Sequence, residues 1–260
     1  MNGASPSDLT CKGISISVPG RTLVDNLDLE IRSGEVLAVL GPNGVGKSLT
    51  LHTMVGLRST DCGTVSLSGR PLDELSRAQV ATRIALLPQY VEDVFPASVL
   101  DTVMIGRHPH IPRFQWESAA DRKIAANSLA LVDLSDMAQR SIATLSGGER
   151  RRLAIAQVLT QSPYIYLLDE PTNHLDPQHQ LDALRIFRDK ANSGAAVVAS
   201  LHDVNLAARF SDRCLLLYGD GRWDIGATKD VLTEQVLTGL YATNMESVAW
   251  RNTRLFVATG

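Results

Sequence analysis

The chain has 260 residues, a net charge of −3 and an apolar content of 44%, so it can bury the core of one large domain or of a domain with a subdomain. This charge excludes the global basic footprint of a nucleic-acid-binding protein, and we expect no nucleic-acid partner. Cys11, Cys62 and Cys214 lie far apart, which argues against a disulfide framework and against a zinc or iron–sulfur site. The first ten residues lack the pattern of a signal peptide, and the longest apolar runs span about seven residues, far short of the ~20 that cross a bilayer.

The first 90 residues predict mostly strands. Two short strands are expected within residues 11–31, around the turn Pro19-Gly20. The remaining expected elements are a buried strand at 35–40, a helix at about 47–56, a strand at 63–69, a short helix at 72–81 and a strand at 84–87.

The pattern becomes helical from about Tyr90 to Gln161. We expect helices at 98–107 and 118–131, with a break at 108–113, and a third helix after Leu145-Ser146-Gly147-Gly148-Glu149. The rest alternates, which predicts an α/β parallel sheet: strand 164–169, helix about 177–191, strand 196–201, helix about 203–209 and strand 213–218. A tail at about 228–260 predicts short helices and then two short strands.

A phosphate-binding loop follows the strand at 35–40. The sequence GPNGVGKS matches G-x-x-x-x-G-K-[ST], in which glycines let backbone N–H groups surround an anion at a helix N-terminus. Lys47 adds a positive charge near the β- and γ-phosphates, and Ser48 offers a hydroxyl to magnesium. The predicted nucleotide contacts of this segment are Gly41, Pro42, Asn43, Gly44, Val45, Gly46, Lys47, Ser48 and Leu49.

Further polar residues stand at the ends of the predicted elements. Asp169 and Glu170 end a buried strand, so both carboxylates should emerge at the carboxyl edge of the sheet, beside the phosphate-binding loop. Ser146, Gly147 and Gly148 open a helix and form a second anion-binding N-terminus. The other motifs are Leu87-Pro88-Gln89, Asn173-His174-Leu175-Asp176 and His202.

This ordered set resembles the ATP-binding cassette (ABC) family of ATPases from about Cys11 to Val257, and LSGGE is its most specific motif. The resemblance implies an α/β fold: a P-loop NTPase core with a mostly parallel sheet, an N-terminal antiparallel β subdomain and an inserted helical subdomain at about 90–161. Residues 1–260 are expected to form a single ATPase domain. The implied activity is ATP hydrolysis, with ATP and Mg²⁺ bound.

The resemblance also implies roles for single residues. Glu170 matches the general base, Gln89 the glutamine that contacts magnesium and water, and His202 the histidine that touches the γ-phosphate. Asp169 matches the magnesium-organising position, so the expected metal set is Ser48, Gln89 and Asp169. Ser146, Gly147 and Gly148 match the signature that binds the γ-phosphate of the other subunit. Asp176 matches a loop that crosses the interface, so two copies should pair head-to-tail.

Two positions depart from the family pattern. Val18 stands where the family usually has an aromatic residue that stacks on adenine. The adenine contact must come either from Val18, which would pack on the base more weakly, or from another residue. Leu49 replaces the usual threonine, while Ser48 still supplies the magnesium hydroxyl. We interpret Arg150-Arg151-Arg152 as a helix face with mixed contacts rather than a nucleic-acid site.

More narrowly, the chain resembles the ATPases that energise uptake of iron–siderophore complexes, haem and cobalamin. This narrower resemblance rests on four segments, residues 106–110, 173–176, 201–207 and 230–233. This implies a separate permease dimer in the membrane, a periplasmic or surface substrate-binding protein, and a peripheral location at the cytoplasmic face of the inner (plasma) membrane. The alternative is a soluble ABC ATPase of the iron–sulfur assembly or DNA-repair type. The segment between the P-loop and the signature has no sustained heptads, which argues against a chromosome-type coiled coil.

Overall fold

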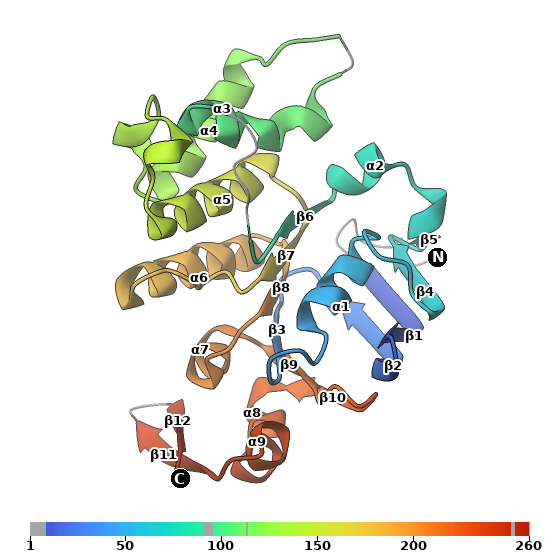
Figure 1. Cartoon of the computed structure of the whole chain (residues 1–260). Helices are drawn as coiled ribbons and strands as arrows, with labels where there is room; N and C mark the ends of the chain where they lie inside the picture. The colour runs from blue at the N-terminus through green and yellow to red at the C-terminus, as the bar shows by residue number, and fades with distance from the viewer. Residues whose placement is uncertain (1–8, 91–95, 113, 251–252, 260) are drawn as a thin grey trace.

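The computed structural model describes residues 9–90, 96–112, 114–250 and 253–259. A six-stranded sheet with the order β10-β9-β3-β8-β7-β6 forms the centre of the molecule (Figure 1). All its neighbouring strands run parallel except β10, which is antiparallel to β9. The strands are β3 (Val36–Leu40), β6 (Ile84–Leu87), β7 (Ile165–Asp169), β8 (Ala196–Ser200), β9 (Arg213–Leu217) and β10 (Trp223–Ala227).

The five parallel strands of this sheet are buried on both faces, as continuous apolar strands require. In β3, Ala38 and Leu40 pack with the helices α5 (Gly147–Gln161), α6 (Pro177–Asn192) and α7 (Val204–Phe210), while Leu37 and Val39 pack on the opposite side. That side is covered by α1 (Lys47–Met54) and the N-terminal sheet (Figure 1). The predicted α/β class with a mostly parallel sheet is confirmed.

The N-terminal strands form an antiparallel sheet with the order β2-β1-β4-β5. They are β1 (Leu9–Val18), β2 (Arg21–Ile31), β4 (Cys62–Leu67) and β5 (Arg70–Pro71), so the first two are longer than predicted. The helix predicted at 72–81 is wrong. A 3₁₀ turn, η1 (Leu72–Glu74), ends at the extended Leu75, and α2 (Arg77–Ala81) begins anew because Ser76 and Gln79 form a capping box.

The helical insertion lies at the upper end of Figure 1. It contains α3 (Val99–Met104), η2 (Ile105–His110), α4 (Ala119–Leu131), η3 (Ser135–Met137), η4 (Ile142–Thr144) and α5. The first helix is shorter than predicted because the chain changes to 3₁₀ geometry before Pro109, whose ring nitrogen cannot donate a helical bond. Arg107 bonds to Asp121 at 2.8 Å and to the carbonyl oxygen of Thr160 at 3.1 Å, which joins η2, α4 and α5.

The C-terminal tail forms the lower end of Figure 1. Two short helices, α8 (Thr228–Val231) and α9 (Glu234–Tyr241), precede the hairpin of β11 (Met245–Trp250) and β12 (Thr253–Ala258), as predicted. The hairpin is tied to α7 because Asn205 exchanges two hydrogen bonds with the backbone of Phe256, at 2.7 and 3.1 Å. The strand β10 was not predicted, although Trp223 and Ile225 alternate with polar Asp224.

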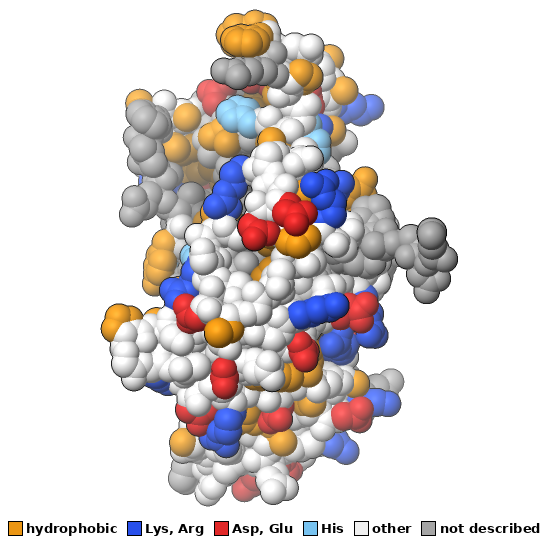
Figure 2. Space-filling view, turned by 90° about the vertical axis from the view of Figure 1, so that its right-hand side faces the viewer, with side chains coloured by type: hydrophobic (Ala, Val, Ile, Leu, Met, Phe, Trp, Pro, Cys, Tyr) orange, Lys and Arg blue, Asp and Glu red, His pale blue; other side chains and the backbone are white. Residues whose placement is uncertain are grey.

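Basic and acidic side chains are interspersed over the middle and lower parts of the face in Figure 2, and apolar side chains gather at its upper end. Phe114 and Trp116, between η2 and α4, are 93% and 89% exposed. Over the described ranges, none of the helices combines the length and the apolarity that a membrane crossing requires.

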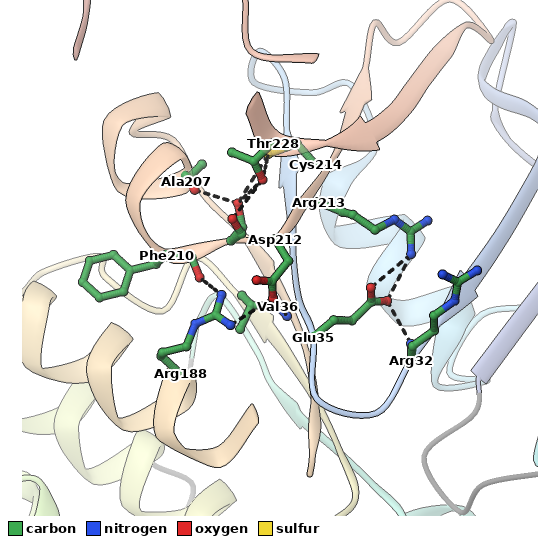
Figure 3. Close-up of polar contacts among 11 residues, drawn as sticks. Arg32, Glu35, Val36, Arg188, Ala207, Phe210, Asp212, Arg213, Cys214 and Thr228 are labelled. Atoms are coloured by element: carbon green, nitrogen blue, oxygen red, sulfur yellow. Dashed lines mark hydrogen bonds and ion pairs between the residues drawn. The ribbon is translucent and has the colours of Figure 1, made fainter. Parts of the chain in front are cut away.

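Polar contacts tie the strands together at the edge where β3 and β9 begin (Figure 3). Asp212 accepts a bond from the Val36 N–H at 2.8 Å and one from Arg188 of α6 at 2.9 Å. Arg213 bonds to both oxygens of Glu35, at 3.1 and 3.2 Å. These bonds hold β3 beside β9 and α6, and so set where the opposite end of β3 delivers the phosphate-binding loop.

Candidate functional site

The phosphate-binding loop connects β3 to α1. Gly41 has a φ of +148°, and a Cβ atom there would lie 2.3 Å from the carbonyl oxygen of Leu217, so no larger residue fits this approach of the loop to β9. Gly46 precedes α1 in a left-handed conformation, and the helix begins at Lys47 as predicted. The first turn of α1 therefore points its free N–H groups toward the loop.

Lys47 lies folded against the loop in this structure. Its Nζ donates to the carbonyl oxygens of Gly41, at 2.8 Å, and Pro42, at 3.1 Å, and the residue is 6% exposed. Burial lowers the pKa of Lys47, while the negative charges of Glu170 and Asp169 act in the opposite direction. The two carbonyl oxygens carry no full charge, so a bound phosphate would give Lys47 the negative partner that they do not provide.

A cavity of about 590 Å³ opens beside this loop. It is lined by Val18, the predicted adenine contact, by residues of the loop, and by the three predicted catalytic residues Gln89, Glu170 and His202. Gly41, Pro42, Val45 and Asp169 are not among the residues that line it. The complete lining is Val18, Arg21, Leu23, Asn43, Gly44, Gly46, Lys47, Ser48, Leu49, Gln89, Glu170, Asn173 and His202.

Glu170 is the most constrained polar group of the cavity. Its Oε2 accepts bonds from Gln89 Nε2, at 2.8 Å, and from Asn173 Nδ2, and its Oε1 is hydrogen-bonded to His202 Nε2. The residue is 6% exposed and has a φ of +50°, a left-handed conformation that is rare outside glycine. Such a backbone persists only where the surroundings hold it, and it directs the carboxylate into the cavity.

Asp169 lies one residue earlier, at the end of β7. Its Oδ1 accepts a bond from the Ser200 hydroxyl at 2.7 Å, and the same hydroxyl accepts one from the Glu170 N–H at 2.8 Å. Its Oδ2 is buried and has no hydrogen-bond partner among the described residues. A buried carboxylate oxygen without a donor is the kind of group that a hard cation satisfies, so Asp169 fits the magnesium position expected for it.

The signature residues lie outside this cavity. Ser146 caps α5 and forms a capping box with Glu149, so the helix N-terminus is preformed. A Cβ atom on Gly148 would lie 3.1 Å from the carbonyl oxygen of His174, in the loop after β7. Asp176 caps α6 by accepting bonds from the His179 N–H at 2.9 Å and its Nδ1 at 2.8 Å, and these bonds lower the pKa of Asp176.

Three polar residues of the cavity region were not among the predicted site residues, namely Asn173, Ser200 and Arg21. Asn173 belongs to the NHLD motif, but its bond to Glu170 depends on the turn between them. Ser200 pairs with Asp169 across β8 and β7, so its signal is a hydroxyl at the end of a neighbouring parallel strand. Arg21 lines the cavity beside Val18 and donates from its Nε to the carbonyl oxygen of Gly219 at 2.6 Å.

A phosphate-binding loop and acidic residues at the carboxyl edge of a parallel sheet define a P-loop nucleotide hydrolase. The signature at the start of α5 and the matches to known proteins make the class narrower. The sequence profile described as ABC transporter matches residues 24–173, and the chain belongs to the ABC transporter family. It is therefore an ATP-binding subunit with ATPase activity.

The chain is similar to curated ABC proteins named for import. It is 40% identical to the hemin import ATP-binding protein HmuV of Gloeobacter violaceus, over 95% of this chain and 91% of that protein. It is 39% identical to the cobalamin import ATP-binding protein BtuD of Halobacterium salinarum, where the match covers 90% of this chain but spans only 58% of that protein. A solved structure of a metal-chelate type ABC transporter in an inward-facing conformation has a TM-score of 0.84 and 28% identity, with 98% of both chains covered.

Proposed function

We propose that the chain is the ATP-hydrolysing subunit of an importer for a metal chelate, namely haem, an iron–siderophore complex or cobalamin. Relatives named for hemin and cobalamin import support this cargo class and favour it over a soluble ABC ATPase of the iron–sulfur assembly or DNA-repair type. The observation that carries the catalytic part is the buried carboxylate of Glu170, which faces the phosphate-binding loop across one cavity and is held by three polar side chains.

ATP would place its phosphates on the loop from Gly41 to Ser48. Lys47 would exchange its two carbonyl acceptors for phosphate oxygens. These also accept hydrogen bonds but carry negative charge, which makes the bonds stronger. The residues that would hold magnesium are Ser48, Gln89 and Asp169, and the ion would neutralise charge on the β- and γ-phosphates.

Glu170 would accept a proton from the water that attacks the γ-phosphorus. In this structure the carboxylate of Glu170 bonds to three side chains, those of Gln89, Asn173 and His202. A carboxylate has about four acceptor sites, so Oε1 can accept a further bond from that water. Gln89 and His202 would then turn toward the water and the γ-phosphate.

A second copy would complete each site. Ser146, Gly147, Gly148 and Asp176 do not line the cavity, yet the first three form a preformed anion-binding helix end. A head-to-tail pair would bring this end of each copy onto the nucleotide of the other.

The remaining partners follow from the proposed transport role. They are a permease dimer in the membrane and, indirectly, a periplasmic or surface substrate-binding protein. The chain would bind the permease from the cytoplasmic face of the inner (plasma) membrane, through the region between Gln89 and about Arg107.

Two measurements test the proposal. A deletion strain should fail to grow on one of haem, ferric siderophores or cobalamin as the required source, and the wild-type chain should restore growth while Glu170→Gln should not. The chain should also co-purify with an integral-membrane protein. Normal growth on all three sources together with purification free of membrane protein would contradict the importer role.

A further inference from the structure

Arg151 is a buried cation in the second turn of the signature helix α5. It is 5% exposed, whereas Arg150 and Arg152 on either side are half-buried. The expectation of mixed contacts suits these two neighbours, because Arg150 bonds to the Leu145 carbonyl oxygen and Arg152 to that of Val132. Arg151 instead points inward, toward the loops of the catalytic site.

The guanidinium of Arg151 connects two of these loops. Nη1 donates to the carbonyl oxygen of Pro88 at 2.6 Å and lies 3.4 Å from that of Gln89. Nη2 donates to the carbonyl oxygens of Asp169, at 2.5 Å, and Glu170, at 2.7 Å. Nε donates to that of Pro171 at 3.3 Å. One side chain thus spans the segments that carry the predicted glutamine and the predicted base.

The chemistry of the contact requires arginine. Its planar guanidinium presents donors in a fixed fork, so a single group can bond to carbonyl oxygens from separate segments at once. Burial lowers the pKa of Arg151 to about 10, and the nearby charges of Asp169 and Glu170 oppose this shift, so the side chain stays charged at neutral pH. Its bonds also support the left-handed backbone of Glu170, whose φ is +50°.

The same helix carries the signature at its N-terminus. Ser146 lies five residues before Arg151, about 7.5 Å along the helix axis. Gly148 lies three residues before Arg151, so the two residues share one face of the helix. This face contacts the loop after β7 at a second point, where Gly148 approaches the carbonyl oxygen of His174. A displacement of the N-terminal end of α5 would therefore act on the loop that carries Glu170 through two contacts, those of Arg151 and Gly148.

We propose that Arg151 is a positioning residue that couples the two ATP sites of the head-to-tail dimer. When the signature of one copy binds the nucleotide of its partner, α5 moves, and the guanidinium carries the main chain of Gln89 and Glu170 of the same copy with it. Each copy thus arranges its own base in response to the nucleotide of the other. This inference rests on the proposed ATPase dimer.

The experiment compares Arg151→Gln and Arg151→Lys with Arg152→Gln in the full chain. Arg152 is the matched control, since its guanidinium also bonds to two carbonyl oxygens, those of Val132 and Asp133, but in the helical subdomain. Three quantities are measured for each protein: ATP affinity in the absence of hydrolysis, the steady-state ATPase rate against ATP concentration, and ATP-induced dimerisation in a Glu170→Gln background.

We expect the wild type to hydrolyse ATP cooperatively, with a Hill coefficient that approaches 2, the number of sites. Arg151→Gln should lower kcat at least about tenfold, the equivalent of 1.36 kcal/mol, and bring the Hill coefficient close to 1. ATP affinity of the single chain should change less than about twofold, because the loop at residues 41–48 is untouched. ATP-induced dimerisation should weaken as well, since coupling is reciprocal.

Arg151→Lys keeps the charge but offers a single nitrogen to two loops, so it should show the same pattern more weakly. It also carries the test if Arg151→Gln does not fold. Arg152→Gln should keep the cooperativity of the wild type. Wild-type kcat and Hill coefficient in both Arg151 variants would overturn the proposal, and so would an equal loss of cooperativity in Arg152→Gln. A wild type that neither hydrolyses ATP nor dimerises with it would instead refute the proposed function.

Discussion

The change Glu170→Gln separates two tasks of this carboxylate, namely to accept the hydrogen bonds that hold the site together and to act as the general base in ATP hydrolysis. One task is structural, because its oxygens bond to Gln89, Asn173 and His202. A glutamine has one acceptor oxygen, and its amide nitrogen would face at least one of these donors. The variant therefore loses at least one charge-assisted bond at a site that is 6% exposed.

The size of both effects can be worked out. A hydrogen bond to a charged group contributes about 1.5–3 kcal/mol, and 1 kcal/mol corresponds to about 2–4 °C in Tm for a chain of this size. Without added nucleotide, we expect the variant to melt about 3–12 °C below the wild type. Loss of a general base lowers kcat by about 10²- to 10⁴-fold. ATP affinity should be equal or higher, because a negative charge near Lys47 and the phosphates is removed.

The assay combines thermal melts with and without Mg-ATP, phosphate release, and gel filtration in ATP. The variant should gain thermal stability from ATP and accumulate as an ATP-bound dimer, since the γ-phosphate stays in place. Glu74→Gln is the matched control, because Glu74 is exposed on η1, outside the lining of the cavity. Phosphate release by Glu170→Gln within tenfold of the wild-type rate would refute the assignment of the general base.

Three further changes test other parts of the molecule. Ser146→Arg should leave ATP binding by the single chain intact, because Lys47 is untouched, but abolish ATP-induced dimerisation and hydrolysis; full hydrolysis by an isolated monomer would contradict the trans site. Val18→Tyr should tighten ATP binding up to about tenfold by stacking on the base and leave tripolyphosphate binding unchanged, and titrations with both ligands check this. Asp121 bonds to Ser118 and Arg107, and these bonds lower the pKa of its carboxyl from 3.8 to about 2. The bonds therefore stabilise the fold above pH 4, and this stabilisation is lost as the pH falls toward 2. Asp121→Asn should therefore reduce the unfolding free energy by about 1 kcal/mol at pH 7, and the difference in denaturant melts should shrink between pH 4 and 2; a difference that is constant with pH would refute the ionic contribution.

The features that depend on neighbouring residues could be predicted from the amino-acid sequence. The loop at residues 41–48 is contiguous, so its phosphate-binding shape follows from its glycines and from the strand and helix on either side. The predicted order of strands and helices in the core also follows from local periodicity, and the carboxyl ends of parallel strands share one edge. For this reason Asp169 and Glu170 were expected beside the loop.

Which side chains meet beside this loop depends on the packing of segments that are far apart in the chain. Gln89 and His202 lie 81 and 32 residues from Glu170 in the chain, and their bonds to its carboxylate depend on how β6, β7 and β8 align. Arg151 belongs to a run of three arginines that have the same chemistry in sequence, yet it alone of the three turns inward because α5 packs on the loop after β7. A side chain's direction and its partners are set by packing between distant segments, and a one-dimensional pattern does not contain that information.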